Sequence, residues 1–185
     1  MTAYSKDHMI VEFASRTKSN LLFLESVVKS QPESKLYEVT QLINSLIGLI
    51  VLPFEKLKMG KIVTIQRNGI EYKRYNLRIP NKTLEEMEKE GWVAPTVIGN
   101  YPEIIDLYQL VYYLRNAGAH FNIDFESDPF THQITGVKVE DYSFDRNRKV
   151  WEKIWEAELS IDALRDNVLR FIDIILQSEG KTWAE

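Results

Sequence analysis

The feature that most constrains the fold is the helical spacing of apolar residues, which recurs in four long stretches of the 185-residue chain. Apolar side chains return every three or four positions, the period of one face of an α-helix. The clearest stretch carries Leu36, Val39, Leu42, Ile43, Leu46, Ile47 and Ile50. The pattern predicts helices over Lys6–Lys29, Lys35–Lys58, Pro102–His120 and Leu159–Gln177, with Ser160 as a cap for the last. A mainly α fold follows, with four main helices around one core.

Two segments between these helices have the composition of β-hairpins. Residues 61–79 place Asn68-Gly69 between β-prone runs, which is a strong short hairpin signal. Residues 122–144 contain turn-forming dipeptides and end in an alternating run that indicates a strand. Shorter helices are predicted over residues 84–91 and Arg148–Ile154.

The composition excludes several kinds of site. The chain has no cysteine, which excludes disulfides, thiol catalysis and cysteine-ligated zinc or iron–sulfur centres. A net charge of -4 gives no overall attraction to nucleic acid, although it is compatible with a local basic cleft that holds phosphates. The most apolar segment, Val39–Pro53, is shorter than the roughly 20 residues that cross a bilayer, and the N-terminus lacks a secretory signal. We therefore expect one cytoplasmic domain, residues 1–185, with no membrane partner.

The segment LRNAGAHFN, residues 114–122, holds the candidate chemistry in Arg115, Asn116 and His120. On an ideal helix Arg115 and His120 lie about 140° apart, so they share a face only if the helix ends or loosens first, which Gly118 favours. Histidine exchanges protons near neutral pH, with a reference pKa of about 6.5, and arginine matches the oxygens of a phosphate. The set suits cleavage of an RNA phosphodiester by its own 2′-hydroxyl. An ordinary helix end attracts the same residue types, and from spacing alone it is the more frequent explanation.

The same segment resembles the signature of HEPN domains, in which an arginine, a polar residue and a histidine lie late in a helix of an all-helical protein. Thr40–Glu55 is similar to the first core helix of a HEPN subgroup found on plasmids and other mobile elements. The run ITGVKVEDYSF is similar to the hairpin that follows the motif in that subgroup. The resemblance extends over Lys35–Gln177 and implies a HEPN-like four-helix up-and-down bundle, with residues 61–79 and 122–144 as two β-hairpin insertions.

For function, the resemblance implies a metal-independent endoribonuclease without a cofactor, acting as a toxin or in defence against phage or mobile elements. HEPN domains commonly dimerise, so that the arginine and histidine of both copies face each other in one cleft. His120 would act as base or acid, Arg115 would hold the scissile phosphate, and Asn116 would orient His120 or a phosphate oxygen. The implied partners are an RNA substrate, a second copy of the chain, and an antitoxin or regulatory protein. The alternative is an inactive HEPN dimer that only binds RNA or a regulatory partner.

An acidic run after the motif offers a competing kind of site. Asp124, Glu126 and Asp128 alternate, so on a strand their carboxylates would lie on one face. With His120 or His132 they would form an oxygen-rich metal site and support a magnesium-dependent nuclease. Solvated hairpin residues are the commoner explanation for such a short pattern.

Each group of basic or aromatic residues elsewhere in the chain has two possible interpretations. Basic side chains around the first hairpin either contact an RNA backbone or keep an exposed hairpin soluble: Arg67, Lys73, Arg74, Arg78 and Lys82. Trp151 and Trp155, four residues apart, either stack on bases or pack in the core or an interface. Three tyrosines before the motif either build an interface or belong to the core: Tyr108, Tyr112 and Tyr113.

Overall fold

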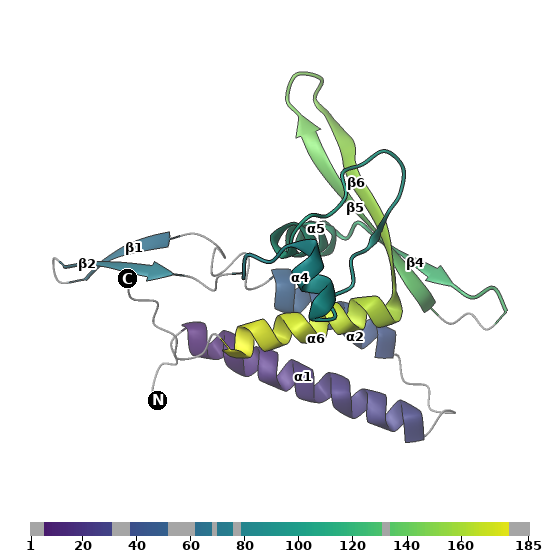
Figure 1. The fold of residues 1–185 in the computed structure, drawn as a ribbon, viewed down its shortest axis with the longest axis horizontal. Coiled ribbons are helices and arrows are strands. Elements are labelled where there is room, and N and C mark those ends of the chain that lie inside the picture. The colour runs from purple at the N-terminus through teal and green to yellow at the C-terminus, as the bar shows by residue number, and fades with distance from the viewer. Residues whose placement is uncertain are drawn as a thin grey trace.

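The computed structural model describes residues 6–30, 38–51, 62–67, 70–75, 79–130 and 134–177. Each of the four long apolar stretches forms helix there: α1 (Lys6–Ser30), α2 (Glu38–Leu46), α5 (Leu107–His120) and α6 (Ile161–Gln177). A π-helix, η1 (Ile47–Val51), follows α2 directly and contacts α5. The rest of the predicted second helix lies outside the described residues. Helices α1 and α6 run side by side (Figure 1).

A four-stranded antiparallel sheet fills much of the second half of the chain, in the order β3–β6–β5–β4. Its strands are β3 (Thr96–Val97), β4 (Ile123–Ser127), β5 (Ile134–Asp145) and β6 (Val150–Ser160). The pairing of β5 with β6 runs from Gly136↔Ser160 to Asp145↔Val150, with a register shift after Asp141. Figure 1 shows the outer part of this two-stranded ribbon reaching beyond α5.

The expected four-helix up-and-down bundle with two hairpin insertions is therefore wrong. Within the described residues, five α-helices, including the short α4 (Leu84–Lys89), stand with a four-stranded sheet. Residues 122–144 contain β4 and most of β5, but these strands belong to the larger sheet. Arg148–Ile154, predicted to be helical, is a turn followed by the start of β6. The error arose because Trp151, Ile154 and Trp155 repeat at helical spacing, whereas backbone pairing with β5 holds them in a strand, and such tertiary context overrides local pattern.

The core lies where α5 and α6 pack against the sheet. Alternate positions on the two long strands are buried, with Val137 and Val139 on β5 and Ala157 and Leu159 on β6. The helices contribute Leu110, Leu114, Leu164, Val168 and Phe171 to the same cluster. Burying one such large side chain contributes about 1.5–3 kcal/mol, so this contact fixes the end of α5 relative to β5 and β6.

The other described elements are a two-stranded hairpin and the short helix α4. The predicted hairpin of residues 61–79 contains β1 (Ile62–Arg67) and β2 (Ile70–Tyr75), which pair antiparallel. Helix α4 begins at a capping box between Thr83 and Glu86, and Gly91, with φ of 79°, follows its end. None of the described helices is both long and apolar enough to cross a membrane.

Candidate functional site

Helix α5 positions all three residues of the motif. It begins after Asp106, whose carboxylate accepts a hydrogen bond from the backbone N–H of Gln109 at 2.8 Å. Residues 102–106 were predicted to belong to this helix but are not helical. The helix does not end at Gly118 but continues to His120 and stops where Phe121 adopts the left-handed conformation, with φ of 56° and ψ of 31°. Backbone N–H groups of residues 121 and 122 then bond to the carbonyls of residues 118 and 117, the Schellman pattern of a helix end.

Because the helix is continuous, Arg115 and His120 lie on different sides of it. Five residues of regular helix separate their directions by about 140°. Arg115 is half-buried, whereas His120 is exposed at the end of the helix. A single chain therefore does not bring the guanidinium and the imidazole together.

Asn116 lies inside the protein and links α5 to the sheet. Its side chain is only 6% exposed, and its Nδ2 donates to Oδ2 of Asp141 on β5 at 3.0 Å. Its Oδ1 accepts from Nη1 of Arg115 at 2.6 Å. Asp141 is 2% exposed and also accepts from the backbone N–H of Tyr142 at 2.9 Å. The chain Arg115–Asn116–Asp141 thus anchors the guanidinium to β5, while within the described residues no hydrogen bond joins Asn116 to His120.

Asp141 also affects the pKa of Tyr113, whose ring stacks on Trp155 with ring centroids 4.3 Å apart. Burial raises the pKa of Tyr113 above 10.0, and the negative charge of Asp141 raises it further. Asp141 therefore sits next to an aromatic contact between α5 and β6 as well as to the motif.

His120 opens onto a cavity of about 290 Å³ that Asn122, Tyr142 and Trp151 also line. Asn122 is held by its backbone from two sides. Its N–H donates to Ala117 at the helix end, and its carbonyl accepts from the N–H of Glu140 on β5, both at 3.0 Å. The cavity therefore has a fixed wall at the junction of α5 and β4, and a second wall on the β5–β6 ribbon.

Tyr142 connects this cavity to a charged network on β5 and β6. Its hydroxyl donates to Glu140 at 2.5 Å, and Lys153 Nζ lies 2.6 Å from Glu140 and 2.8 Å from Glu156. Lys138 also pairs with Glu156, at 2.5 Å. Two lysines thus balance two glutamates, and the network places no net charge beside the cavity.

The same contacts shift two pKa values. Burial raises the pKa of Glu140, but hydrogen bonds from Lys153 and Tyr142 oppose this and hold it below its ordinary 4.5. The hydrogen bond to Glu140 raises the pKa of Tyr142 above 10.0. Both groups therefore keep their ordinary charge states at neutral pH, the glutamate ionised and the tyrosine neutral.

Sequence reasoning did not single out Asn122, Asp141 or Tyr142. A signal for Asp141 was present, because it follows Val137 and Val139 at the inward-facing positions of an alternating strand. A carboxylate at a buried position needs hydrogen-bond donors, and the motif amide is such a donor. Asn122 and Tyr142 carry no comparable signal, since the cavity that joins them exists only after folding.

The predicted acidic site is not assembled in the described part of the chain. Asp124 and Glu126 lie on β4, and Asp128 follows it and accepts from the backbone N–H of Phe130 at 2.9 Å. No group of three histidine or acidic side chains is placed to hold a metal ion among the described residues. His132 lies outside them.

The two tryptophans predicted as a helical pair have separate environments on β6. Trp155 is fully buried, whereas Trp151 is 66% exposed and lies against Phe144, with ring centroids 5.4 Å apart. On α5, the exposed rings of Tyr108 and Tyr112 stack at 6.3 Å.

The predicted basic cluster is described only in part. Lys82 pairs with Glu90. Arg67, Lys73 and Arg74 belong to β1 and β2, whose side chains the structure does not describe, and Arg78 lies outside the described residues.

Comparison with known proteins adds one finding to this geometry. The family described as HEPN pEK499 p136 matches residues 1–182, a span that includes Arg115, Asn116 and His120. No curated protein and no solved structure matches the chain.

Proposed function

The chain belongs to the HEPN pEK499 p136 family, and from this premise we propose that it is a metal-independent endoribonuclease of the HEPN type. The observation that carries the proposal is the anchored motif. Asn116 and Asp141 hold Arg115 against β5, while His120 is presented to solvent at the mouth of a cavity. A rigidly held cation and an accessible proton carrier are what phosphodiester cleavage requires.

Each motif residue has a distinct role in the proposal. His120 removes the proton of the 2′-hydroxyl or protonates the leaving oxygen, because imidazole exchanges protons near neutral pH. Arg115 holds the scissile phosphate and stabilises its additional negative charge in the transition state. Asn116 positions Arg115 through its hydrogen bond, since it is buried and bonded to Arg115 and Asp141. The RNA supplies its own nucleophile, so these steps call for no metal ion.

We propose further that two copies form one active site. Within one chain Arg115 and His120 diverge, so a second copy has to supply the complementary group. Tyr108, Tyr112, Arg115 and Ala119 follow one another at spacings of four, three and four residues and therefore form one stripe of α5. Two exposed aromatic rings at the start of that stripe give it the composition of an interface core. Packing two such stripes together would place the arginines of both copies at one interface.

The biological setting follows from the family as part of the same proposal. By cleaving cellular or invading RNA, the protein would act as a toxin or in defence against phage and mobile elements, with an antitoxin or regulatory protein as partner. We expect expression of the wild type to arrest cell growth and expression of His120→Ala not to do so.

The decisive experiment is cleavage of labelled RNA with and without EDTA. We expect cleavage that resists EDTA and falls at least 100-fold in His120→Ala and in Arg115→Ala, in line with the contribution of general acid–base groups. Arg16→Ala, which removes an exposed arginine of α1, is the matched control and should cleave normally. EDTA-resistant cleavage by His120→Ala would sink the assignment of that residue. RNA that is bound but never cleaved by the wild type would favour the inactive dimer.

Mixing the two inactive variants tests the shared site. If Arg115 of one copy acts with His120 of the other, mixed dimers of Arg115→Ala and His120→Ala recover part of the activity. Two inactive variants that stay inactive when mixed, although they exchange subunits, would contradict a site made by two copies.

A further inference from the structure

The cavity beside His120 has the size and the lining of a site for one planar group. Its volume of about 290 Å³ lies just below the range for drug-sized ligands, about 300–1,000 Å³, and suits a smaller group. The four side chains around it combine two aromatic rings, an amide and an imidazole. None of the roles given above to Arg115, Asn116 and His120 uses Trp151, Tyr142 or Asn122.

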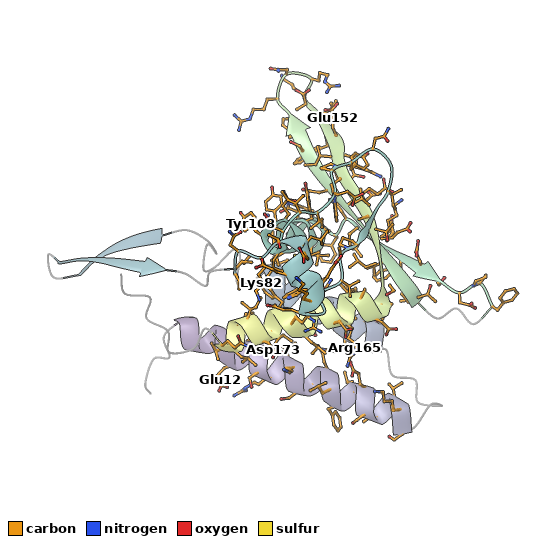
Figure 2. All side chains as sticks on the ribbon, in the orientation of Figure 1. Glu12, Lys82, Tyr108, Glu152, Arg165 and Asp173 are labelled. Carbon is orange, nitrogen blue, oxygen red and sulfur yellow. The ribbon has the colours of Figure 1, made fainter. Side chains whose placement is uncertain are left out.

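Trp151 supplies an aromatic surface that folding does not bury. Its side chain is 66% exposed, although tryptophan is the largest apolar residue and is usually well covered. It is nevertheless held in place, because Phe144 pairs with it directly across the β5–β6 ribbon and the rings lie 5.4 Å apart. Figure 2 labels the next residue, Glu152, on the outer part of this ribbon. A supported, exposed indole is the kind of platform on which a nucleobase stacks.

Asn122 supplies hydrogen-bonding groups at the opposite wall. Two backbone hydrogen bonds, to Ala117 and from Glu140, fix its position between α5 and the sheet. Its half-buried side chain makes no hydrogen bond within the described residues, and a side-chain amide offers both donors and an acceptor. Such a group matches the edge of a base, which also presents donors and acceptors side by side.

The turn between β5 and β6 adds positive charge on the same ribbon. It contains Arg146, Arg148 and Lys149, of which Arg148 pairs with Asp145 and Glu152. Arg146 and Lys149 are exposed and form no ion pair within the described residues. Lys149, in the turn, precedes Trp151 by two residues, and two residues span at most about 7 Å. It therefore lies within reach of a phosphate attached to a nucleotide stacked on Trp151.

We propose that the cavity binds the nucleobase of the single-stranded RNA nucleotide next to the scissile phosphate. Trp151 stacks on the base, Asn122 contacts its edge, and Arg146 and Lys149 contact the flanking backbone. The base then holds its ribose against His120, which lines the same cavity. Lys138 and Lys153 pair with Glu156 and Glu140, so these two carboxylates add no net repulsion towards phosphate. This inference rests on the proposed function and assigns the substrate-binding part of that site.

Binding is tested with fluorescein-labelled 2′-O-methyl oligonucleotides, which cannot be cleaved because the nucleophile is blocked. Anisotropy titration of mixed-sequence hexamers should show Kd raised about 10-fold or more in Trp151→Ala, given about 1–3 kcal/mol per stacked base. Trp151→Phe should stay within about 3-fold of the wild type because it keeps an aromatic face. Phe130→Ala removes an even more exposed aromatic side chain beyond β4 and should have no effect.

Salt dependence separates the two kinds of contact. Lys149→Ala should reduce the slope of log Kd against log salt by about 0.7, the value for one phosphate contact of a single strand. Asn122→Ala should change the preference among oligo-A, oligo-C, oligo-G and oligo-U while leaving that slope unchanged. A Trp151→Ala protein that is folded by circular dichroism and binds as tightly as the wild type would overturn the proposal, as would a wild type that binds no hexamer.

Cleavage of all-RNA substrates separates this inference from the proposed activity. Trp151-dependent binding without any cleavage by the wild type supports the base site and contradicts the nuclease. Cleavage by Trp151→Ala at the wild-type rate and at the same positions contradicts the base site and leaves the nuclease standing.

Discussion

Replacing Asn116 with alanine should lower the free energy of unfolding by about 2–4 kcal/mol and also abolish most RNA cleavage. The hydrogen bond from Asn116 Nδ2 to Asp141 Oδ2 involves a charged acceptor, and such bonds contribute about 1.5–3 kcal/mol. Its loss leaves Asp141, only 2% exposed, with the backbone N–H of Tyr142 as its remaining donor in this network. A buried charge deprived of a partner adds to the cost.

A double-mutant cycle isolates this one interaction. Asn116→Ala, Asp141→Ala and the double variant are unfolded with urea and followed through tryptophan fluorescence, to which the buried Trp92 and Trp155 contribute. We expect the two single changes to be non-additive by about 1.5–3 kcal/mol, as for residues in direct contact in one network. Asp141→Asn keeps the size of the side chain and should destabilise less than Asp141→Ala.

Asn167 provides the matched control for the effect on cleavage. It is also buried, and its side chain bonds to the backbone of Val93 through both polar atoms, at 2.9 and 2.8 Å. Asn167→Ala should therefore destabilise by about 1–3 kcal/mol yet leave kcat/KM per folded molecule unchanged. Asn116→Ala should lower kcat as well, because Arg115 loses its anchor. A coupling energy below about 0.5 kcal/mol, or equal activity of the two alanine variants, would refute the anchoring role.

Three further changes have defined outcomes. Two hydrogen bonds from Arg165 lower the pKa of Glu25 below 4.5. This ion pair therefore stabilises the folded protein fully above pH 4.5, and its contribution is lost as pH falls through the lowered pKa. Glu25→Gln should cost about 1 kcal/mol at pH 7, and its urea curves should converge with those of the wild type in acid. Ser160→Ala removes the hydroxyl that accepts from Ala163 N–H at 3.1 Å and should cost about 1 kcal/mol in thermal unfolding. Tyr112→Arg should disrupt the proposed dimer and give the mass of a monomer in light scattering. A mass equal to that of the wild type would count against the α5 stripe as the interface.

The sequence predicted the long helices because each buries one apolar stripe, and that pattern has the period of the helix itself. It failed for β6, where the apolar spacing of Trp151, Ile154 and Trp155 imitates a helix. Only the pairing partner β5, which lies earlier in the chain, decides that these residues form a strand. The extended sheet was missed for the same reason, since strand pairing is a long-range property.

The same distinction between local and long-range information applies to the candidate site. Arg115, Asn116 and His120 could be predicted as candidates because they are neighbours on one helix and their chemistry is apparent from the local sequence. Asp141 was missed because its contact with Asn116 joins positions 25 residues apart. The direction of His120 also depended on where α5 ends, and Gly118 suggested the wrong place because the buried packing of Ala117 and Gly118 keeps the helix intact to His120.

The end of α5 carries a strained residue directly after His120, and this strain is testable. Phe121 is held in the left-handed conformation that costs a non-glycine residue about 1–2 kcal/mol, and its ring is 78% exposed, so folding offsets little of that cost. Phe121→Gly should therefore raise the free energy of unfolding by about 1 kcal/mol, whereas Phe121→Ala should not. An exposed ring kept at a strained position is explained if it contacts RNA or the second copy, and strain of this kind is concentrated at functional sites. We thus expect Phe121→Gly to be more stable but to bind the 2′-O-methyl hexamer or the partner copy more weakly. A Phe121→Gly variant that is more stable and still binds both the hexamer and the partner copy as tightly as the wild type would show that Phe121 only terminates the helix.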